Sequence, residues 1–124
     1  MPNTVFFKCE KCGNIIGLID GNEHNLKCCG EEMKNLVANT ADAAKEKHVP
    51  VIEREGNEFI VRVGEIEHPM EEDHYIMWIA QVSENRTTRV RLHPGESTKT
   101  VFPYIPGSTF YAYCNKHNLW KKEV

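Results

Sequence analysis

The sequence predicts an all-β protein in which a small, metal-bound N-terminal domain is followed by a β-sandwich. Three features of the 124-residue chain support this prediction. Four of the five cysteines are clustered near the N-terminus. Beyond them, short runs of apolar and β-branched residues are separated by turn sequences roughly every 8–12 residues, a spacing typical of a sandwich. No long amphipathic helical pattern interrupts these runs.

The first domain is expected to span residues 1–36 and to consist of short strands and turns. Phe6 and Phe7 precede the first cysteine, and an apolar run at residues 15–19 leads into a turn sequence at residues 20–22. A segment of this size buries too little apolar surface to offset the conformational entropy that it loses on folding. Such domains therefore depend on a metal or on disulfides.

The clustered cysteines form a candidate metal site. A Cys-x-x-Cys motif and an adjacent pair supply four thiolates, the ligand set of a tetrahedral zinc or iron site. The four residues are Cys9, Cys12, Cys28 and Cys29. Gly13 and Gly30 directly follow the two pairs and permit the tight backbone turns that such a site needs. Two disulfides or free buried thiols are the alternatives, and ligand type alone does not separate electron-carrying iron from structural zinc.

The second domain is expected to span residues 37–124. Its first residues, 37–45, are small and polar and are interpreted as a connector. Phe59, Val61 and Val63 fall on one face of a predicted strand, because side chains alternate along a strand. Further strands are predicted at residues 75–82, 87–92, 99–104 and 109–114.

Charge and hydropathy exclude several classes of function. The chain has 15 Lys and Arg against 18 Asp and Glu, a formal net charge of −3. This balance gives no general attraction to nucleic acid or to an anionic membrane. No stretch approaches the roughly 18 apolar residues of a membrane span, and the N-terminus lacks a secretory signal pattern. We therefore expect a soluble cytoplasmic protein, in which thiols stay reduced unless a metal binds them.

Four histidines and the fifth cysteine are further candidate ligands. Each lies in a loop or at the edge of a predicted strand, where a scaffold can direct side chains to a common point. They are His48, His68, His74, Cys114 and His117. A single histidine is more often an ordinary surface or core residue than a ligand. Cys114 and His117, however, form a Cys-x-x-His pair after the strand expected to be the last, a spacing found in metal sites. His24 and His93 fall in turn sequences and are expected to be solvated and uninvolved.

Together these motifs resemble those of the desulfoferrodoxin family, the two-iron superoxide reductases. The resemblance extends over essentially the whole chain, with the motifs in order and at compatible spacing. The motifs are Cys9-x-x-Cys12 with Cys28-Cys29, Glu46-Lys47-His48-Val49-Pro50, His68-Pro69-Met70-x-x-x-His74-Tyr75-Ile76, and Cys114-Asn115-x-His117 with Trp120. One departure is Asn118, where family members commonly have glycine. If that position requires a left-handed backbone, asparagine is the next most tolerant residue.

The resemblance implies a desulforedoxin-like ferric site formed by the four N-terminal thiolates and, in an immunoglobulin-like sandwich, a catalytic iron. The catalytic iron would have four equatorial imidazoles, from His48, His68, His74 and His117, and the Cys114 thiolate as its axial ligand. Glu46 is similar to the glutamate that takes the sixth position in the oxidised form. Lys47 is similar to the lysine that attracts superoxide and helps to protonate the product. The family is typically homodimeric and often receives electrons from rubredoxin.

The implied activity is superoxide reduction, in which superoxide, one electron and two protons give hydrogen peroxide. Five donors are more than the four of a typical zinc site and leave one face open on a metal that prefers six ligands. Two alternatives stay open from the sequence. One is a non-catalytic zinc-ribbon and β-sandwich module, and the other is an iron electron-transfer protein whose histidine site is closed.

Overall fold

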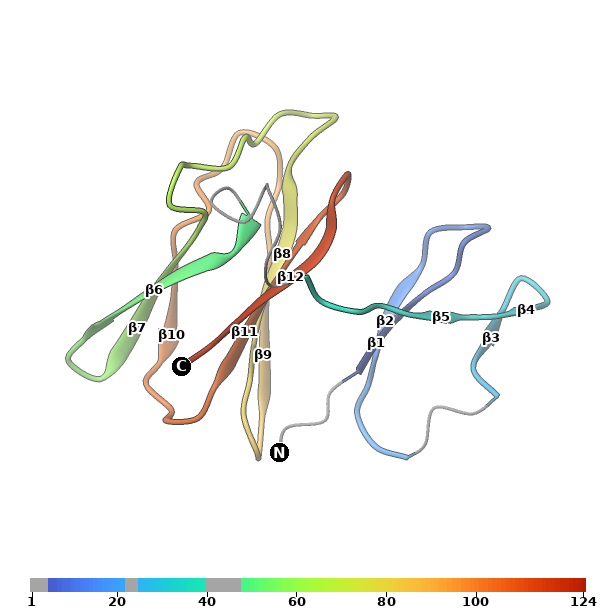
Figure 1. Ribbon diagram of the computed structural model, residues 1–124, viewed down its shortest axis with the longest axis horizontal. Coiled ribbons are helices and arrows are strands. Elements are labelled where there is room, and N and C mark those ends of the chain that lie inside the picture. The colour runs from blue at the N-terminus through green and yellow to red at the C-terminus, as the bar shows by residue number, and fades with distance from the viewer. Residues whose placement is uncertain (1–4, 22–24, 40–47) are drawn as a thin grey trace. The chain divides into compact units, whose positions relative to one another are not determined.

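The computed structural model describes residues 5–21, 25–39 and 48–124, which are drawn in colour in Figure 1. The chain divides into two compact units, Asn3–Val37 and Ala38–Val124. Every regular element within the described ranges is a β-strand, which confirms the predicted all-β class. Within those ranges, no helix is long and apolar enough to cross a membrane.

The smaller unit contains two short antiparallel sheets, one with the strand order β2-β1-β5 and one formed by the β3–β4 hairpin. The strands are β1 (Val5–Lys8), β2 (Ile15–Leu18), β3 (Lys27–Cys28), β4 (Glu31–Glu32) and β5 (Lys34–Asn35). Phe6, Phe7 and Cys9 are the buried apolar residues in the described part of this unit. So small a core agrees with a fold that depends on a bound metal.

The larger unit is a sandwich of two antiparallel sheets. One sheet has the strand order β10-β7-β6, and the other has the order β12-β11-β8-β9. The strands are β6 (Pro50–Glu55), β7 (Glu58–Val63), β8 (Ile76–Val82), β9 (Thr87–Arg91), β10 (Thr100–Pro103), β11 (Thr109–Cys114) and β12 (Asn118–Glu123). The predicted sandwich is confirmed.

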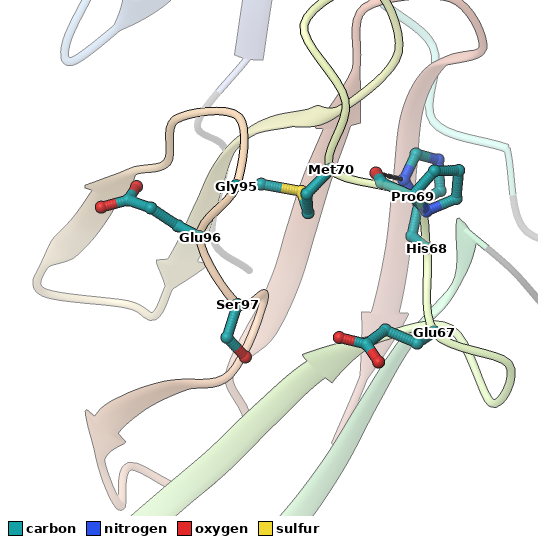
Figure 2. A pocket seen from close by; sticks show the side chains of 7 residues that line it. All are labelled: Glu67, His68, Pro69, Met70, Gly95, Glu96 and Ser97. Carbon is teal, nitrogen blue, oxygen red and sulfur yellow. Dashed lines mark hydrogen bonds between the residues drawn. The ribbon is translucent and has the colours of Figure 1, made fainter.

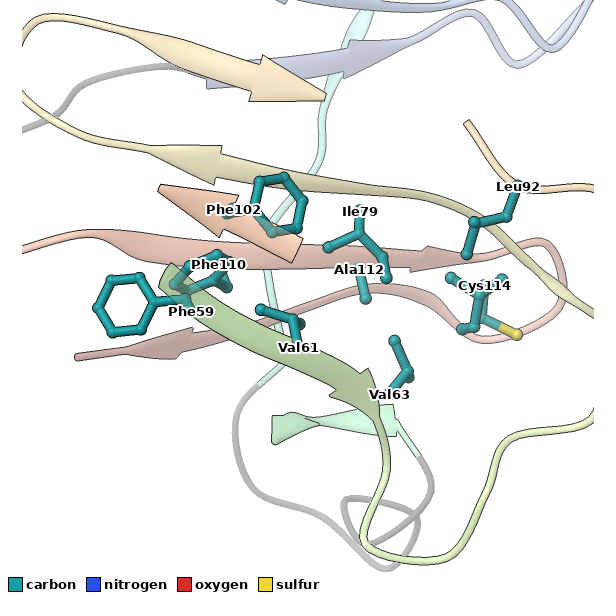
Figure 3. Close-up of a cluster of buried hydrophobic side chains, with 10 residues drawn as sticks. Phe59, Val61, Val63, Ile79, Leu92, Phe102, Phe110, Ala112 and Cys114 are labelled. Carbon is teal, nitrogen blue, oxygen red and sulfur yellow. The ribbon is translucent and has the colours of Figure 1, made fainter. Parts of the chain in front are cut away.

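The core of the sandwich lies between the two sheets (Figure 3). Phe59, Val61 and Val63 of β7 are all buried, as the alternation of side chains along one strand predicts. They belong to a cluster whose other members are Ile76, Ile79, Leu92, Phe102, Phe110, Ala112 and Cys114. Figure 3 shows Cys114 at one end of this cluster, so the apolar core ends at a candidate metal ligand.

The five predicted strands are confirmed, with ends that differ by no more than one residue. Two strands lie outside the predicted runs: β6 and β12, each at the edge of its sheet. Charged residues such as those at 53–55 and 121–123 obscure their apolar pattern, and edge strands commonly carry such charges. The expectation that residues 109–114 form the last strand is wrong. Because β12 follows, Cys114 is the last residue of β11 and His117 lies in the turn of a β11–β12 hairpin.

Candidate metal centres

The five candidate ligands of the larger unit meet at one end of the sandwich. His48 precedes β6, His68 and His74 lie between β7 and β8, Cys114 ends β11, and His117 precedes β12. In antiparallel pairs the end of one strand lies beside the start of its partner, so these segments gather at the same end. The ligand atoms of all five residues lie within 4.8 Å of one another.

The four imidazoles form a closed ring in which each contacts two neighbours. The order around the ring is His48, His68, His74 and His117. Neighbouring ring centroids are 4.7–5.1 Å apart, and the interplanar angles are 62–78°. Steep interplanar angles keep the rings from stacking on one another, while their nitrogens approach a shared centre. Four imidazoles arranged in this way could hold one metal ion.

Two of these histidines carry buried nitrogens that lack partners. The Nε2 atoms of His68 and His74 are buried and have no hydrogen-bond partner in the described structure. Buried polar atoms are almost always paired, so both atoms point to a missing partner at the centre. In His68, the Nδ1–H donates to the Pro69 carbonyl at 2.7 Å, which leaves the Nε2 lone pair free for a metal. Burial also lowers the pKa of His68 to about 4, so its ring is neutral, the form that binds metals.

Distances between the ligand atoms fit a metal at the centre. His48 Nε2 lies 3.1 Å from His117 Nδ1. Metal–nitrogen bonds of about 2.1 Å at right angles would place adjacent nitrogens about 3.0 Å apart. The Cys114 sulfur lies 3.7 Å from the same His117 nitrogen, close enough to complete a five-donor set.

Cys114 joins this group from the core side. Its side chain is fully buried, and in Figure 3 its sulfur points away from the other members of the core cluster. Burial raises the pKa of the Cys114 thiol, while backbone N–H groups of Lys116 and His117 hydrogen-bond the sulfur and act in the opposite direction. A cation at the centre would favour the thiolate further, as coordination does for any cysteine ligand.

Trp120 supports two of the ligands, and sequence reasoning assigned it no role. Its ring stacks on the His48 imidazole with centroids 4.7 Å apart and planes at 18°. Its Nε1–H donates to the His117 carbonyl at 2.9 Å. The signal that could have identified it was its place within the motif that contains Cys114.

The four N-terminal cysteines also converge. The sulfurs of Cys9, Cys12, Cys28 and Cys29 lie within 4.8 Å of one another, and none of them forms a disulfide. The Cys12–Cys28 and Cys28–Cys29 sulfur separations are 3.5 and 3.9 Å. A tetrahedron of thiolates about 2.3 Å from a metal has edges of about 3.8 Å. The geometry fits a tetrathiolate site and disfavours the disulfide alternative.

The backbone explains how adjacent cysteines reach one metal. Cys29 has a φ of +54°, a left-handed conformation that is uncommon for a residue with a Cβ. Gly13 and Gly30, with φ of +83° and +78°, make the turns that their positions predicted. Hydrogen bonds led by the Cys12 backbone N–H lower the pKa of Cys9 to about 6, whereas hydrogen bonding to Cys12 raises the pKa of Cys28 to about 12. The four sulfurs therefore share hydrogen bonds through their remaining protons, and a bound metal would displace those protons.

A hollow of about 470 Å³ adjoins the group of four histidines, which it reaches at His68 (Figure 2). It is lined by residues 67–70 and 95–97. Two of the side chains in this lining, Glu67 and Glu96, are carboxylates, whose charge repels a small anion. We therefore do not regard the hollow as an entry for an anionic substrate.

The remaining predicted residues fall into two groups. Glu46, Lys47 and His24 lie outside the described residues. His93 is exposed and its Nδ1 lies 3.3 Å from the Glu96 carboxylate, in agreement with the expectation that it is a solvated residue.

Comparisons with known proteins match both units. The family model described as desulfoferrodoxin matches residues 40–123, and that of the desulfoferrodoxin N-terminal domain matches residues 3–36. A desulfoferrodoxin of Syntrophotalea carbinolica is 48% identical over 118 residues, which cover 94% of each chain. The crystal structure of the superoxide reductase from Treponema pallidum has a TM-score of 0.78 and 26% identity, with 98% of each chain covered. A superoxide reductase (1Fe-SOR) from Giardia intestinalis, 31% identical with a TM-score of 0.58, covers 64% of this chain and 98% of its own.

Proposed function

The chain belongs to the desulfoferrodoxin family, and on that premise we propose that it is an enzyme that reduces superoxide to hydrogen peroxide. The observation that carries this proposal is the convergence of four imidazoles and one cysteine sulfur within 4.8 Å. Five donors exceed the four of a typical zinc site and leave one position open on a six-coordinate metal. Similarity to superoxide reductases of known structure supports the same activity.

Both ligand groups would hold iron. In the domain of residues 1–36, the four thiolates would hold one ferric ion, and in the domain of residues 37–124 the histidine ring and Cys114 would hold the catalytic iron. When bound, the catalytic iron supplies the single electron that, with two protons, converts superoxide to hydrogen peroxide. The unpaired Nε2 atoms of His68 and His74 support this assignment, because a cation would satisfy both.

The surrounding residues determine how superoxide reaches the site. Cys114 is fully buried at the end of the core, so the core side of the group is closed to water. His117 is exposed, and the ligand group therefore borders solvent. A small anion would therefore approach from the side of His117 and not from the side of Cys114.

Glu46 and Lys47 complete the proposed site on the strength of the family resemblance. The chain carries a net charge of −3, which opposes the approach of superoxide. The ammonium group of Lys47 would provide a local positive field and carry a proton at Nζ for the product. The Glu46 carboxylate would be a further ligand of the oxidised iron.

We propose a cytoplasmic location, a homodimer, and electron transfer from a rubredoxin-like donor. None of the five cysteines forms a disulfide, as expected in a reducing compartment. The donor and the dimer rest on the family resemblance. Size-exclusion chromatography and reduction by rubredoxin under anaerobic conditions would test them.

Elemental analysis, visible spectra and the reaction with superoxide test the proposed function together. We expect two irons per chain, thiolate-to-iron charge transfer, and one hydrogen peroxide per superoxide consumed without release of oxygen. Zinc in both sites with no reaction would instead identify a structural module. Iron in both sites that neither binds azide or cyanide nor reacts with superoxide would identify a closed electron-transfer protein.

A further inference from the structure

A single side chain ties the turn between β11 and β12 to the loop before β8. The Oδ1 atom of Asn115 accepts a hydrogen bond from the Tyr75 N–H at 3.0 Å, and its Nδ2 donates to the Asp73 carbonyl at 3.0 Å. The Asn115 backbone N–H also donates to the Tyr75 carbonyl at 3.2 Å. These three hydrogen bonds hold the backbone on both sides of His74.

His74 depends on this backbone support more than His68 does. A metal-binding histidine is usually oriented by a hydrogen bond from its second ring nitrogen, which His68 makes to the Pro69 carbonyl. Among the described residues, no such hydrogen bond reaches the ring of His74. Apart from its contacts with the neighbouring His68 and His117 rings, its orientation therefore depends on where its backbone is held.

The backbone around His74 is held both from within its own loop and from outside it. Its N–H and carbonyl pair with Glu71 at 3.1 and 3.0 Å, which stabilises the loop but does not fix the loop against the rest of the site. Asn115 supplies external contacts on both sides of His74, in addition to the pairing of Ile76 with Cys114 and the hydrogen bond from the Gly95 N–H to the Met70 carbonyl. Because Asn115 directly follows Cys114 in the chain, it links the backbone of an equatorial ligand to the backbone of the sulfur ligand.

We propose that Asn115 is a positioning residue that sets the place of His74 relative to the Cys114 sulfur, and thereby the iron affinity and the electronic state of the histidine site. This inference rests on the proposed function, because it assumes that both residues bind iron. Asn115 itself would touch neither the metal nor superoxide.

Competition with a chelator measures the expected effect in the intact, iron-loaded protein. Outer residues that orient metal ligands typically change metal affinity by about 10- to 100-fold when they are replaced. We expect Asn115→Ala to lower the iron affinity of the histidine site by an amount in this range and to shift its thiolate-to-iron charge-transfer band. Asn115→Asp keeps the acceptor for the Tyr75 N–H but loses the donor to Asp73, so an intermediate effect is expected. Iron in the tetrathiolate site serves as an internal reference.

Gln81→Ala is the matched control for loss of stability alone. Like Asn115, Gln81 carries an amide that joins two segments, and unlike the half-buried Asn115 it is fully buried; its Nε2 donates to the Pro103 carbonyl at 2.8 Å and to Ser108 Oγ at 3.1 Å. It contacts no candidate ligand through these bonds. We expect Gln81→Ala to lower the melting temperature without a change in iron affinity or in the charge-transfer band.

Each outcome decides the proposal. If Asn115→Ala binds iron with unchanged affinity and spectrum, or if Gln81→Ala weakens iron binding as much, the positioning role is wrong and the proposed function still stands. If the unmodified protein binds no iron at the histidine site, the proposed function and the positioning role both fail.

Discussion

Replacing Asn118 tests what the turn that carries His117 requires of its backbone. Asn118 has a φ of +68° and pairs with Cys114 across residues 115–117. Hairpin connections of this length commonly end on a left-handed residue, which favours glycine or asparagine. Other L-residues lose about 1–2 kcal/mol in this conformation, and asparagine loses less. Since the Asn118 side chain is exposed, we expect Asn118→Ala to lower the free energy of unfolding by about 1 kcal/mol, through the backbone alone.

Thermal unfolding of the variants at equal iron content measures this difference. A loss of about 1 kcal/mol corresponds to a decrease of about 4–8 °C in the melting temperature of a domain of this size. Asn118→Gly should unfold close to the unmodified protein. Asn85→Ala, in an exposed turn whose backbone is not left-handed, should change the free energy by less than about 0.5 kcal/mol. If Asn118→Ala is as stable as the unmodified protein, or if Asn118→Gly loses as much as it does, the left-handed backbone does not explain the choice of asparagine.

Three further predictions concern the proposed iron site. Cys114→Ser should abolish the thiolate-to-iron charge-transfer band of this site in the visible spectrum, and survival of that band would show that another sulfur is the ligand. Lys47→Ala should slow the second-order reaction with superoxide at low salt while leaving the iron spectrum intact. Lys99→Ala, at an exposed position, is its control. Equal rates for both variants would remove Lys47 from the mechanism. Trp120→Phe keeps an aromatic ring but removes the hydrogen bond to the His117 carbonyl, so release of iron to a chelator should be faster by on the order of fivefold, the equivalent of about 1 kcal/mol. Release at the unmodified rate would show that this hydrogen bond does not hold the site together.

Much of the fold could be predicted because its signals are local. Phe59, Val61 and Val63 alternate along one strand and face the core, and turn sequences separate the strands that were predicted. The edge strands β6 and β12 were not predicted, because consecutive charged residues at 53–55 and 121–123 hide their apolar pattern. Because β12 was not predicted, the position of His117 in the turn of a hairpin was missed as well.

The sequence by itself determined the chemistry of the two sites: four thiols in two close pairs, and imidazoles with one thiol spread between residues 48 and 117. Donor type and short-range spacing are properties of the chain, and so is the family resemblance that connects the scattered motifs. Only the tertiary structure decided that these donors meet, in the order His48, His68, His74 and His117 around one centre. It also decided which outer groups hold them, such as the amide of Asn115 beside His74. Antiparallel pairing of strands that are distant in the chain creates these contacts, and local sequence does not encode them.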